Sequence, residues 1–259
     1  MRDEGAARRG GEEPSKTEDP RAYARARAGT PKLEVLPDAA AVAARAAAHV
    51  AEHARQAVED HDRFTFAVSG GHTPWAMFKA LASEEMPWER TAIFQVDERI
   101  AAAGDPDRNL THLQASLPAG GAAEIHPMPV EAEDLEGATK AYGRELPERL
   151  DLIHLGLGPD GHTASLIPGD PVLEVMDREV ALTGLYQGRR RMTLTYPVLG
   201  RARAILWLVT GADKVDALAR LLAGDASIPA GRVEARRALI VADEEAAPTR
   251  RPRADARSG

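Results

Sequence analysis

The chain alternates between short apolar runs and longer stretches in which apolar residues recur with helical spacing. The short runs predict strands at residues 33–36, 64–68, 91–96, 125–128, 152–155, 191–196, 204–209 and 239–241. The helical spacing predicts helices at residues 37–60, 75–81, 109–117, 132–150 and 215–222. Strands that alternate with helices are typical of an α/β protein, with a mainly parallel, Rossmann-like sheet and helices on both faces.

This alternating pattern covers residues 31–243 without an internal repeat, which predicts a single domain. Residues 1–30 and 244–259 mix Arg, Ala, Glu, Gly and Pro with few large apolar side chains. Segments of this composition bury too little apolar surface to fold, so we expect both to be disordered tails. Their arginine clusters leave open a contact with an acidic partner, although solvated tails are the simpler interpretation.

The composition of the 259-residue chain narrows the classes of function. A net charge of −7 argues against non-specific binding of nucleic acid, although a locally basic pocket can still bind a phosphorylated metabolite. The chain has no cysteine, which excludes disulfides and cysteine metal sites and fits a cytoplasmic protein. No apolar run approaches the ~20 residues of a membrane span, and no signal peptide is recognisable.

Residues 151–169 combine an apolar run with a glycine-rich turn and a histidine. Gly156, Gly158 and Gly161 follow the run, and His162 comes directly after them. A strand that leads through a glycine turn into a helix presents backbone N–H groups to ligands, so we expect a helix start here. A neutral imidazole can take a proton from water at neutral pH. His162 is therefore the candidate general base, and Asp160 is placed to orient it.

The same glycines match the spacing of the dinucleotide-binding fingerprint, but their context disfavours a nucleotide. The motif lies past the middle of the chain, and Pro159-Asp160 puts a carboxylate where a pyrophosphate would approach. No predicted strand ends in an acidic residue at the usual distance downstream. We therefore expect no nicotinamide or flavin cofactor.

Polar clusters follow other predicted strands, where ligands of open α/β sheets usually bind. The glycines of Ser69-Gly70-Gly71 allow an anion to approach the backbone, although a capped turn explains the same residues. Arg99 in Asp97-Glu98-Arg99 is suited to a phosphate, and a structural Asp–Arg pair is the alternative. Lys214 is placed to reach an anion over a helix start, although a lone lysine is usually only solvated.

The histidines do not form a persuasive metal set. His49 and His53 are one helical turn apart, but no carboxylate at matching spacing completes a site. His154 lies within an apolar run and is expected to be buried. Together the clusters suggest metal-free attack of water on an activated carbonyl in a phosphorylated substrate, without a cofactor.

Five blocks, taken in order, resemble the 6-phosphogluconolactonase family. They are Ser69-Gly70-Gly71-His72-Thr73-Pro74, Asp97-Glu98-Arg99 with Asn109, the Asp-Gly-His-Thr-Ala-Ser-Leu sequence of residues 160–166, Arg-Met-Thr-Leu-Thr at 191–195, and Gly211 with Lys214. The resemblance implies a fold shared with glucosamine-6-phosphate deaminase and ribose-5-phosphate isomerase A. It also implies hydrolysis of 6-phospho-D-glucono-1,5-lactone to 6-phosphogluconate in the oxidative pentose phosphate pathway.

The resemblance also implies roles for individual residues. His162 would activate water with Asp160 beside it, and Arg99 and Lys214 would bind the phosphate. Ser69, Gly70, Gly71, Asp97 and Gly158 complete the expected substrate-binding set. The only expected partner is the phosphorylated sugar lactone, with no nucleic acid or membrane, and the protein is expected to be a monomer or a weak dimer.

Some positions depart from the pattern of the family. Arg108 stands where the family usually has Ser, Ile167 where it has Phe, and residues 186–190 replace a proline-rich loop. The related sugar-phosphate deaminases continue after Asp-Gly-His with a segment that contains a Glu, which is absent here.

Two other classes of function stay open. Ala67-x-Ser69-x-Gly71 is similar to a serine nucleophile elbow. A sugar-phosphate-binding module without catalysis would also need the anion-binding turns, although it would not need His162.

Overall fold

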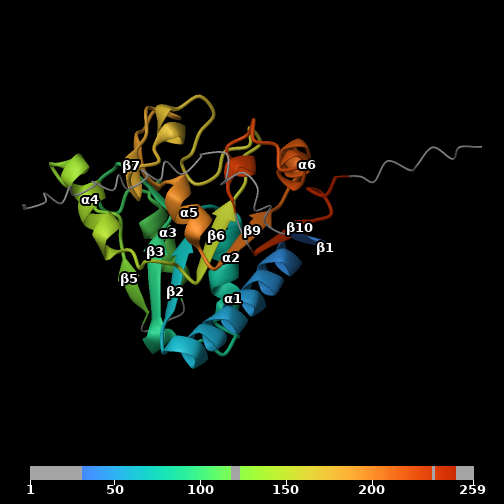
Figure 1. Cartoon of the computed structure of the whole chain (residues 1–259). Coiled ribbons are helices and arrows are strands. Elements are labelled where there is room, and N and C mark those ends of the chain that lie inside the picture. Colours follow the sequence, from blue (N-terminus) through green and yellow to red (C-terminus); the bar gives the residue numbers. More distant parts are fainter. Residues whose placement is uncertain (1–30, 118–122, 235–236, 249–259) are drawn as a thin grey trace, which may run out of the picture.

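The computed structural model describes residues 31–117, 123–234 and 237–248 (Figure 1). The predicted N-terminal tail and residues 249–259 of the predicted C-terminal tail lie outside these residues. Residues 244–247 form a turn in which Ala246 is fully buried and its N–H donates to Asp243 Oδ1. The folded region therefore continues beyond the boundary predicted at residue 243.

A seven-stranded sheet forms the centre of the molecule, and every neighbouring pair in it is parallel. This confirms the predicted α/β class. The order of strands is β1 (Lys32–Leu36), β10 (Ala238–Asp243), β9 (Ala204–Val209), β6 (Leu152–Gly156), β2 (Phe64–Val68), β3 (Thr91–Gln95) and β5 (Glu124–His126).

The central strands are mainly apolar because both faces of the sheet are covered. Along β2, Phe64, Phe66 and Val68 belong to one buried cluster, whereas Ala67 belongs to the other, as the alternation of strand side chains requires. The first cluster receives residues from α1 (Ala39–His61), α2 (His72–Leu81) and α3 (Asn109–Ser116). The second receives residues from α4 (Leu135–Glu145), α5 (Tyr196–Arg201) and α6 (Val215–Leu222).

A three-stranded antiparallel sheet is joined to the main sheet. It contains β4 (Asp97–Arg99), β8 (Arg191–Leu194) and β7 (Val180–Leu182), with β8 in the middle. Val96 joins the two sheets, because its N–H donates to the carbonyl of Val68 and its own carbonyl accepts from Leu194. The sequence pattern predicted neither β4 nor β7, because so short a strand has no readable period and β4 consists of charged residues.

The helix expected after the glycine turn of β6 does not form. Gly161 has φ +82° and Ala164 has φ +51°, and two left-handed residues so close together interrupt a right-handed helix. An isolated bridge joins Thr163 to Leu166 instead. The helical segment that follows is the 3₁₀ turn η3 (Pro171–Glu174); the other 3₁₀ turns are η2 (Trp88–Arg90), η4 (Ala212–Lys214) and η5 (Ala230–Arg232).

The helix predicted at residues 132–150 is shorter than expected. The Asp134 side chain accepts the N–H of Gly137, which caps α4 at its first turn. Pro147 lies shortly after the end of this helix, where a proline is common because it cannot continue a helix. Conversely, α2 begins at His72, earlier than residue 75.

The order in which the chain adds strands to the sheet changes direction between β2 and β6. After β2 it adds β3 and β5 on one side, and it then returns to β6 on the other side. Such a switch point leaves a crevice at the carboxyl ends of the two strands, where open α/β sheets bind ligands. The Ser69 turn follows β2 and the His162 turn follows β6, so the fold places both at this crevice.

The opposite end of the sheet depends on the buried Asp151. Its carboxylate accepts hydrogen bonds from the N–H and Oγ1 of Thr65 and contacts His61 Nε2 and Arg203 Nε. We predict that Asp151→Ala lowers the free energy of unfolding by about 1–3 kcal/mol, because buried donors lose their acceptor. Urea denaturation measures this change. The exposed Asp60, which contacts Gln56, provides the control Asp60→Ala, and an equal loss in the control would contradict the prediction.

Candidate active site

His162 and Asp160 form a hydrogen-bonded pair in the turn that follows β6. Asp160 Oδ1 accepts from the backbone N–H of His162 at 3.1 Å and lies 2.5 Å from His162 Nδ1. Because an ionised carboxylate can only accept, Nδ1 carries the proton and Nε2 keeps its lone pair. The imidazole is 24% exposed, so solvent can reach it.

The charge state of Asp160 suits this arrangement. Partial burial of its carboxyl group opposes ionisation, but the hydrogen bonds from His162 and the charge of its ring outweigh this effect and lower the pKa of Asp160. The carboxylate is therefore ionised at neutral pH. It can hold the ring in one tautomer and stabilise a protonated imidazole.

The glycines of this turn are explained by close packing around the pair. A Cβ at Gly158 would lie 2.1 Å from His162 Nδ1 and 2.7 Å from Asp160 Oδ1. A Cβ at Gly161 would lie 2.5 Å from the side chain of Ile228, and its φ of +82° also favours glycine. The glycine spacing that matches a dinucleotide fingerprint is therefore explained by the space that His162 and its neighbours need in this turn.

Tyr186 contacts the same pair from the β7–β8 hairpin. Its ring lies edge-on to the His162 ring, with centroids 5.7 Å apart, and its hydroxyl is 3.5 Å from Asp160 Oδ2. The guanidinium of Arg191 lies over the Tyr186 ring, 4.8 Å from the centroid. Partial burial and the charge of Asp160 raise the pKa of Tyr186, so its hydroxyl remains a donor at neutral pH. No motif or spacing in the sequence predicts this contact.

Arg191 also lines a cavity of about 300 Å³ between the three-stranded sheet, α2 and α3. Arg99, Arg189, His72, His112 and Asn109 contribute to its wall. Arg189 is held by Asp105 Oδ2 at 3.1 Å and Asp107 Oδ2 at 3.0 Å. The cavity is therefore rich in cationic and hydrogen-bonding groups, although the whole protein is acidic.

Arg99 and Arg191 are register partners across the antiparallel pair of β4 and β8. Like charges directly opposite each other on neighbouring strands are destabilising. Burial, followed by the nearby Arg99, lowers the pKa of Arg191 against the opposing effect of Asp97. The Nε atom of Arg191 is buried and has no hydrogen-bond partner among the residues that the structure describes. An anion between the two guanidinium groups would remove both costs.

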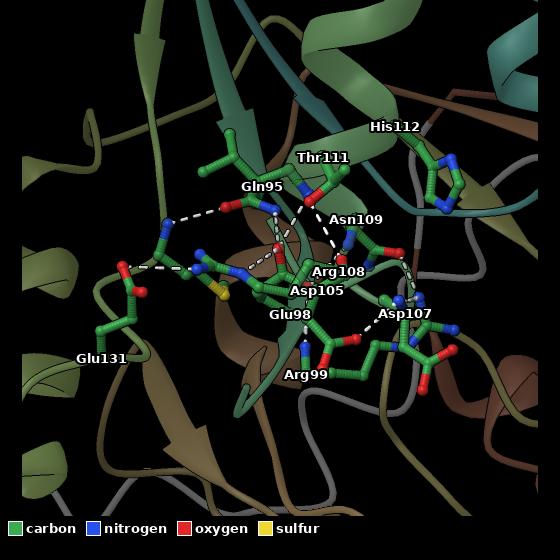
Figure 2. Close-up of polar contacts among 12 residues, drawn as sticks. Gln95, Glu98, Arg99, Asp105, Asp107, Arg108, Asn109, Thr111, His112 and Glu131 are labelled. Atoms are coloured by element: carbon green, nitrogen blue, oxygen red, sulfur yellow. Dashed lines mark hydrogen bonds and ion pairs between the residues drawn. The ribbon is translucent and has the colours of Figure 1, made fainter. Parts of the chain in front are cut away.

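Asn109 fixes the position of Arg99, as Figure 2 shows. Its Oδ1 accepts from Arg99 Nη1 at 2.5 Å, and its Nδ2 donates to the carbonyl of Asp97 at 2.9 Å. A Cβ at Gly70 would lie 1.8 Å from Asn109 Oδ1, so only glycine allows the turn after β2 to pack against this side chain. The first two predicted clusters therefore meet at Asn109.

Ser69 faces the interior rather than the cavity. It is 4% exposed; its N–H donates to His154 Nδ1 and its hydroxyl donates to the carbonyl of His154, both at 3.3 Å. Burial lowers the pKa of His154 to about 3, so this ring is neutral and can accept through Nδ1. The prediction that His154 is buried is confirmed. From this turn, Gly71 and His72 line the cavity.

Asp97 and Lys214 also have partners within the protein. Asp97 is buried, and its Oδ2 accepts from the hydroxyl of Ser165 at 2.6 Å. Lys214 forms an ion pair with Asp213 at 2.8 Å and is not among the residues that line the cavity. The structure therefore brings together Gly71, Arg99 and Asn109, joins them through Arg191 and Tyr186 to the His162 pair, and leaves Lys214 outside this group.

Two classes of feature are absent from the part of the chain that the structure describes. It contains no group of three or more His, Cys, Asp or Glu side chains that could hold a metal ion. His49 and His53 pack ring to ring, with centroids 4.1 Å apart. Nor does it contain a helix that is long and apolar enough to cross a membrane.

The fold and the site define an α/β protein in which a basic cavity adjoins a histidine–carboxylate pair. The chain belongs to the family of glucosamine-6-phosphate isomerases and 6-phosphogluconolactonases, whose model matches residues 37–241. It is 37% identical to a 6-phosphogluconolactonase of Synechocystis over 86% of this chain and 99% of that protein. It is 34% identical to one of Nostoc, over 75% and 86%.

Solved structures give the same result. A 6-phosphogluconolactonase from Thermotoga maritima superposes with a TM-score of 0.73 and 25% identity, covering 82% of this chain and 99% of that one. A monomeric glucosamine-6-phosphate deaminase superposes equally well, with a TM-score of 0.73 over 83% of this chain and 98% of that one, at 17% identity. The fold expected from the sequence is confirmed, including the likeness to the deaminase.

The opposed arginines lead to a prediction about stability. Inorganic phosphate should raise the Tm by a few degrees more than chloride at equal ionic strength, because an anion between Arg99 and Arg191 binds only the folded state. In Arg191→Met the like-charge contact is gone, so this variant should lose the phosphate effect. Differential scanning calorimetry measures both proteins. A variant that kept the full shift would show that phosphate binds elsewhere.

Proposed function

We propose that the protein is a 6-phosphogluconolactonase, which hydrolyses 6-phospho-D-glucono-1,5-lactone to 6-phosphogluconate in the oxidative pentose phosphate pathway. The observation that carries this proposal is a histidine whose Nδ1 is held by a carboxylate and which is linked, through Tyr186 and Arg191, to a cavity with two opposed arginines. The first group suits attack by water, and the second suits a phosphate. The family of the chain and its relatives of this name support the same reaction.

In the proposed mechanism the phosphate enters the basic cavity. Arg99 and Arg191 bind it, together with the backbone of the turn at Gly70 and Gly71. This anchors the lactone so that its C1 carbonyl lies near His162. The role predicted for Lys214 would require it to leave Asp213, and the roles predicted for Ser69 and Asp97 become indirect, because both are occupied within the protein.

The chemical step uses His162 as a general base. Its Nε2 takes a proton from water as the water oxygen attacks C1, and Asp160 stabilises the imidazolium that forms. The tetrahedral intermediate then collapses, the bond from C1 to the ring oxygen breaks, and the imidazolium returns the proton to that oxygen. Backbone N–H groups of the turns around the site are the candidates to stabilise the oxyanion, other than that of Gly158, which donates to the carbonyl of His162 at 2.8 Å.

The competing functions fit the site less well. Sugar-phosphate deamination or isomerisation needs a second acid/base, and this chain has Ile167 at the position where the deaminase pattern brings a Glu. A serine nucleophile is disfavoured because Ser69 is buried and its hydroxyl donates to a backbone carbonyl. A module that only binds sugar phosphates would not need the His162–Asp160 pair.

Replacing the base tests the proposal directly. We predict that His162→Gln lowers kcat by roughly 10²–10⁴, as for loss of a general base, while the fold is unchanged. The assay follows lactone hydrolysis with and without the 6-phosphate, corrected for spontaneous hydrolysis, and circular dichroism checks the fold. His53 on α1, which is not among the residues that line the cavity, offers a matched control, His53→Gln, which should retain kcat. Full activity in His162→Gln would remove this residue from the mechanism.

Replacing Asp160 should lower kcat. The pKa of Asp160 is lowered, so its carboxylate is charged at neutral pH and lies 2.5 Å from His162 Nδ1. In Asp160→Asn this charge is lost and kcat should fall, because the ring is no longer held in one tautomer and the imidazolium formed in the reaction is less stabilised. Steady-state assays at neutral pH measure this effect. The exposed Asp177 supplies the control Asp177→Asn, and an equal kcat in the two variants would disprove the role of Asp160.

A further inference from the structure

Arg108 is a buried cation that stands directly before α3 and outside the cavity wall. It is 3% exposed and lies between two carboxylates, with Nε 3.6 Å from Glu98 Oε2 and Nη1 3.4 Å from Glu131 Oε2 (Figure 2). Its Nε has no hydrogen-bond partner within the described residues. Burial of a charged guanidinium is costly unless the guanidinium is paired with an opposite charge.

Glu98 is the buried carboxylate that is paired with Arg108. Its side chain is completely buried, and its oxygens accept from the side-chain amide of Gln95 and from the backbone N–H groups of Arg99, Asn109 and Leu110. Two of these N–H groups begin α3, so Glu98 caps the helix from the neighbouring strand. Within the described parts of the chain, Arg108 is the only cation that the structure pairs with Glu98.

The ion pair of Arg108 and Glu98 is connected to the cavity through Arg99 and Asn109. Glu98 holds the backbone of Arg99 and Asn109, and the side chains of these two residues meet each other in the cavity wall. Arg99 also donates to the carbonyl of Asp107, in the loop that leads to Arg108. A displacement of Glu98 would therefore move the guanidinium of Arg99 relative to Arg191.

The two carboxylates around Arg108 do not contribute equally. Glu131 is 52% exposed, so its contact with Arg108 is screened by water and contributes little. Glu98 is shielded from solvent, so its contact with Arg108 is not screened by water. Serine, which the family resemblance leads one to expect at this position, is neutral and could not supply the charge. Arg108 therefore acts mainly through its contact with Glu98.

We propose that Arg108 is a positioning residue of the anion site, which holds Glu98 and through it sets Asn109 and Arg99 in the geometry that receives a phosphate. This role rests on the proposed function only for the identity of the substrate. Binding of the anion itself is independent of lactone hydrolysis. Arg108 contributes to affinity for the phosphorylated end of a ligand and leaves the chemistry at His162 unchanged.

Three variants separate this role from a general structural one. Arg108→Met removes the charge but keeps an apolar stem, Arg108→Lys keeps the charge, and Glu131→Gln removes only the exposed partner. We expect Arg108→Met to weaken binding of inorganic phosphate by about tenfold in calorimetric titration, and to raise KM for the phosphorylated lactone by a similar factor. Its kcat and its kcat/KM for the unphosphorylated lactone should stay within about twofold. Arg108→Lys should recover most of the loss, and Glu131→Gln should resemble the parent protein.

Several results would overturn the proposal. One is unchanged phosphate affinity in a folded Arg108→Met protein. Another is an equal loss for the phosphorylated and unphosphorylated lactones, which would indicate general damage to the fold. If Arg108→Met does not fold, Arg108→Gln keeps a polar group for Glu98 and is held to the same criterion. If the parent protein hydrolyses no lactone, the proposed function fails, but the phosphate titration still decides the role of Arg108.

Discussion

The antiparallel pairing of β4 with β8 is the interaction on which the site depends. It places Arg99 opposite Arg191, and the alternation of side chains along β4 gives its three charged residues different surroundings. Asp97 contacts Ser165, Glu98 is buried against the start of α3, and Arg99 reaches the cavity. Three consecutive charges at the end of a buried strand are thus each matched by a separate group.

The second constraint is the topology of the parallel sheet. Because β2 and β6 are neighbours and the chain leaves them in opposite directions, the turns after these strands share one crevice. The β6 turn presents the His162–Asp160 pair, and the β2 turn packs against Asn109 through Gly70. His154 on β6 accepts the N–H of Ser69 and so links this strand to the turn after β2. The parallel sheet supplies the base, whereas the antiparallel sheet supplies both opposed arginines.

The sequence predicted those features that depend on local periodicity or on neighbouring residues. β2, β9 and α6 begin and end at the predicted residues, because each has clear apolar spacing without an internal Gly or Pro. The contact between Asp160 and His162 could be inferred because a single tight turn brings together residues so close in sequence. The left-handed conformation of Ala164 has no such signal, and it removed the helix expected there.

The sequence could not predict which residues lie opposite each other on strands that are far apart in the chain. Arg191 stood in a recognised block and Tyr186 in a loop that departed from the family pattern, but neither position reveals its contact with Arg99 or His162. The opposite error concerns Ser69, whose residue type suggests a phosphate donor. A buried histidine on the neighbouring strand takes its hydrogen bonds, and this can be recognised only once the pairing of β2 with β6 is known.

The opposed arginines also bear on how product leaves the enzyme. A phosphate group is the same before and after lactone hydrolysis, so Arg99 and Arg191 gain equally from substrate and product and cannot favour release. The reaction does create a new carboxylate at C1, and in the proposed binding mode, with C1 near His162, this group would lie close to the ionised Asp160. Repulsion between these two carboxylates acts on the product alone. The residue that orients the base before the reaction would then expel the acid formed by it, and turnover would not require the phosphate site to loosen.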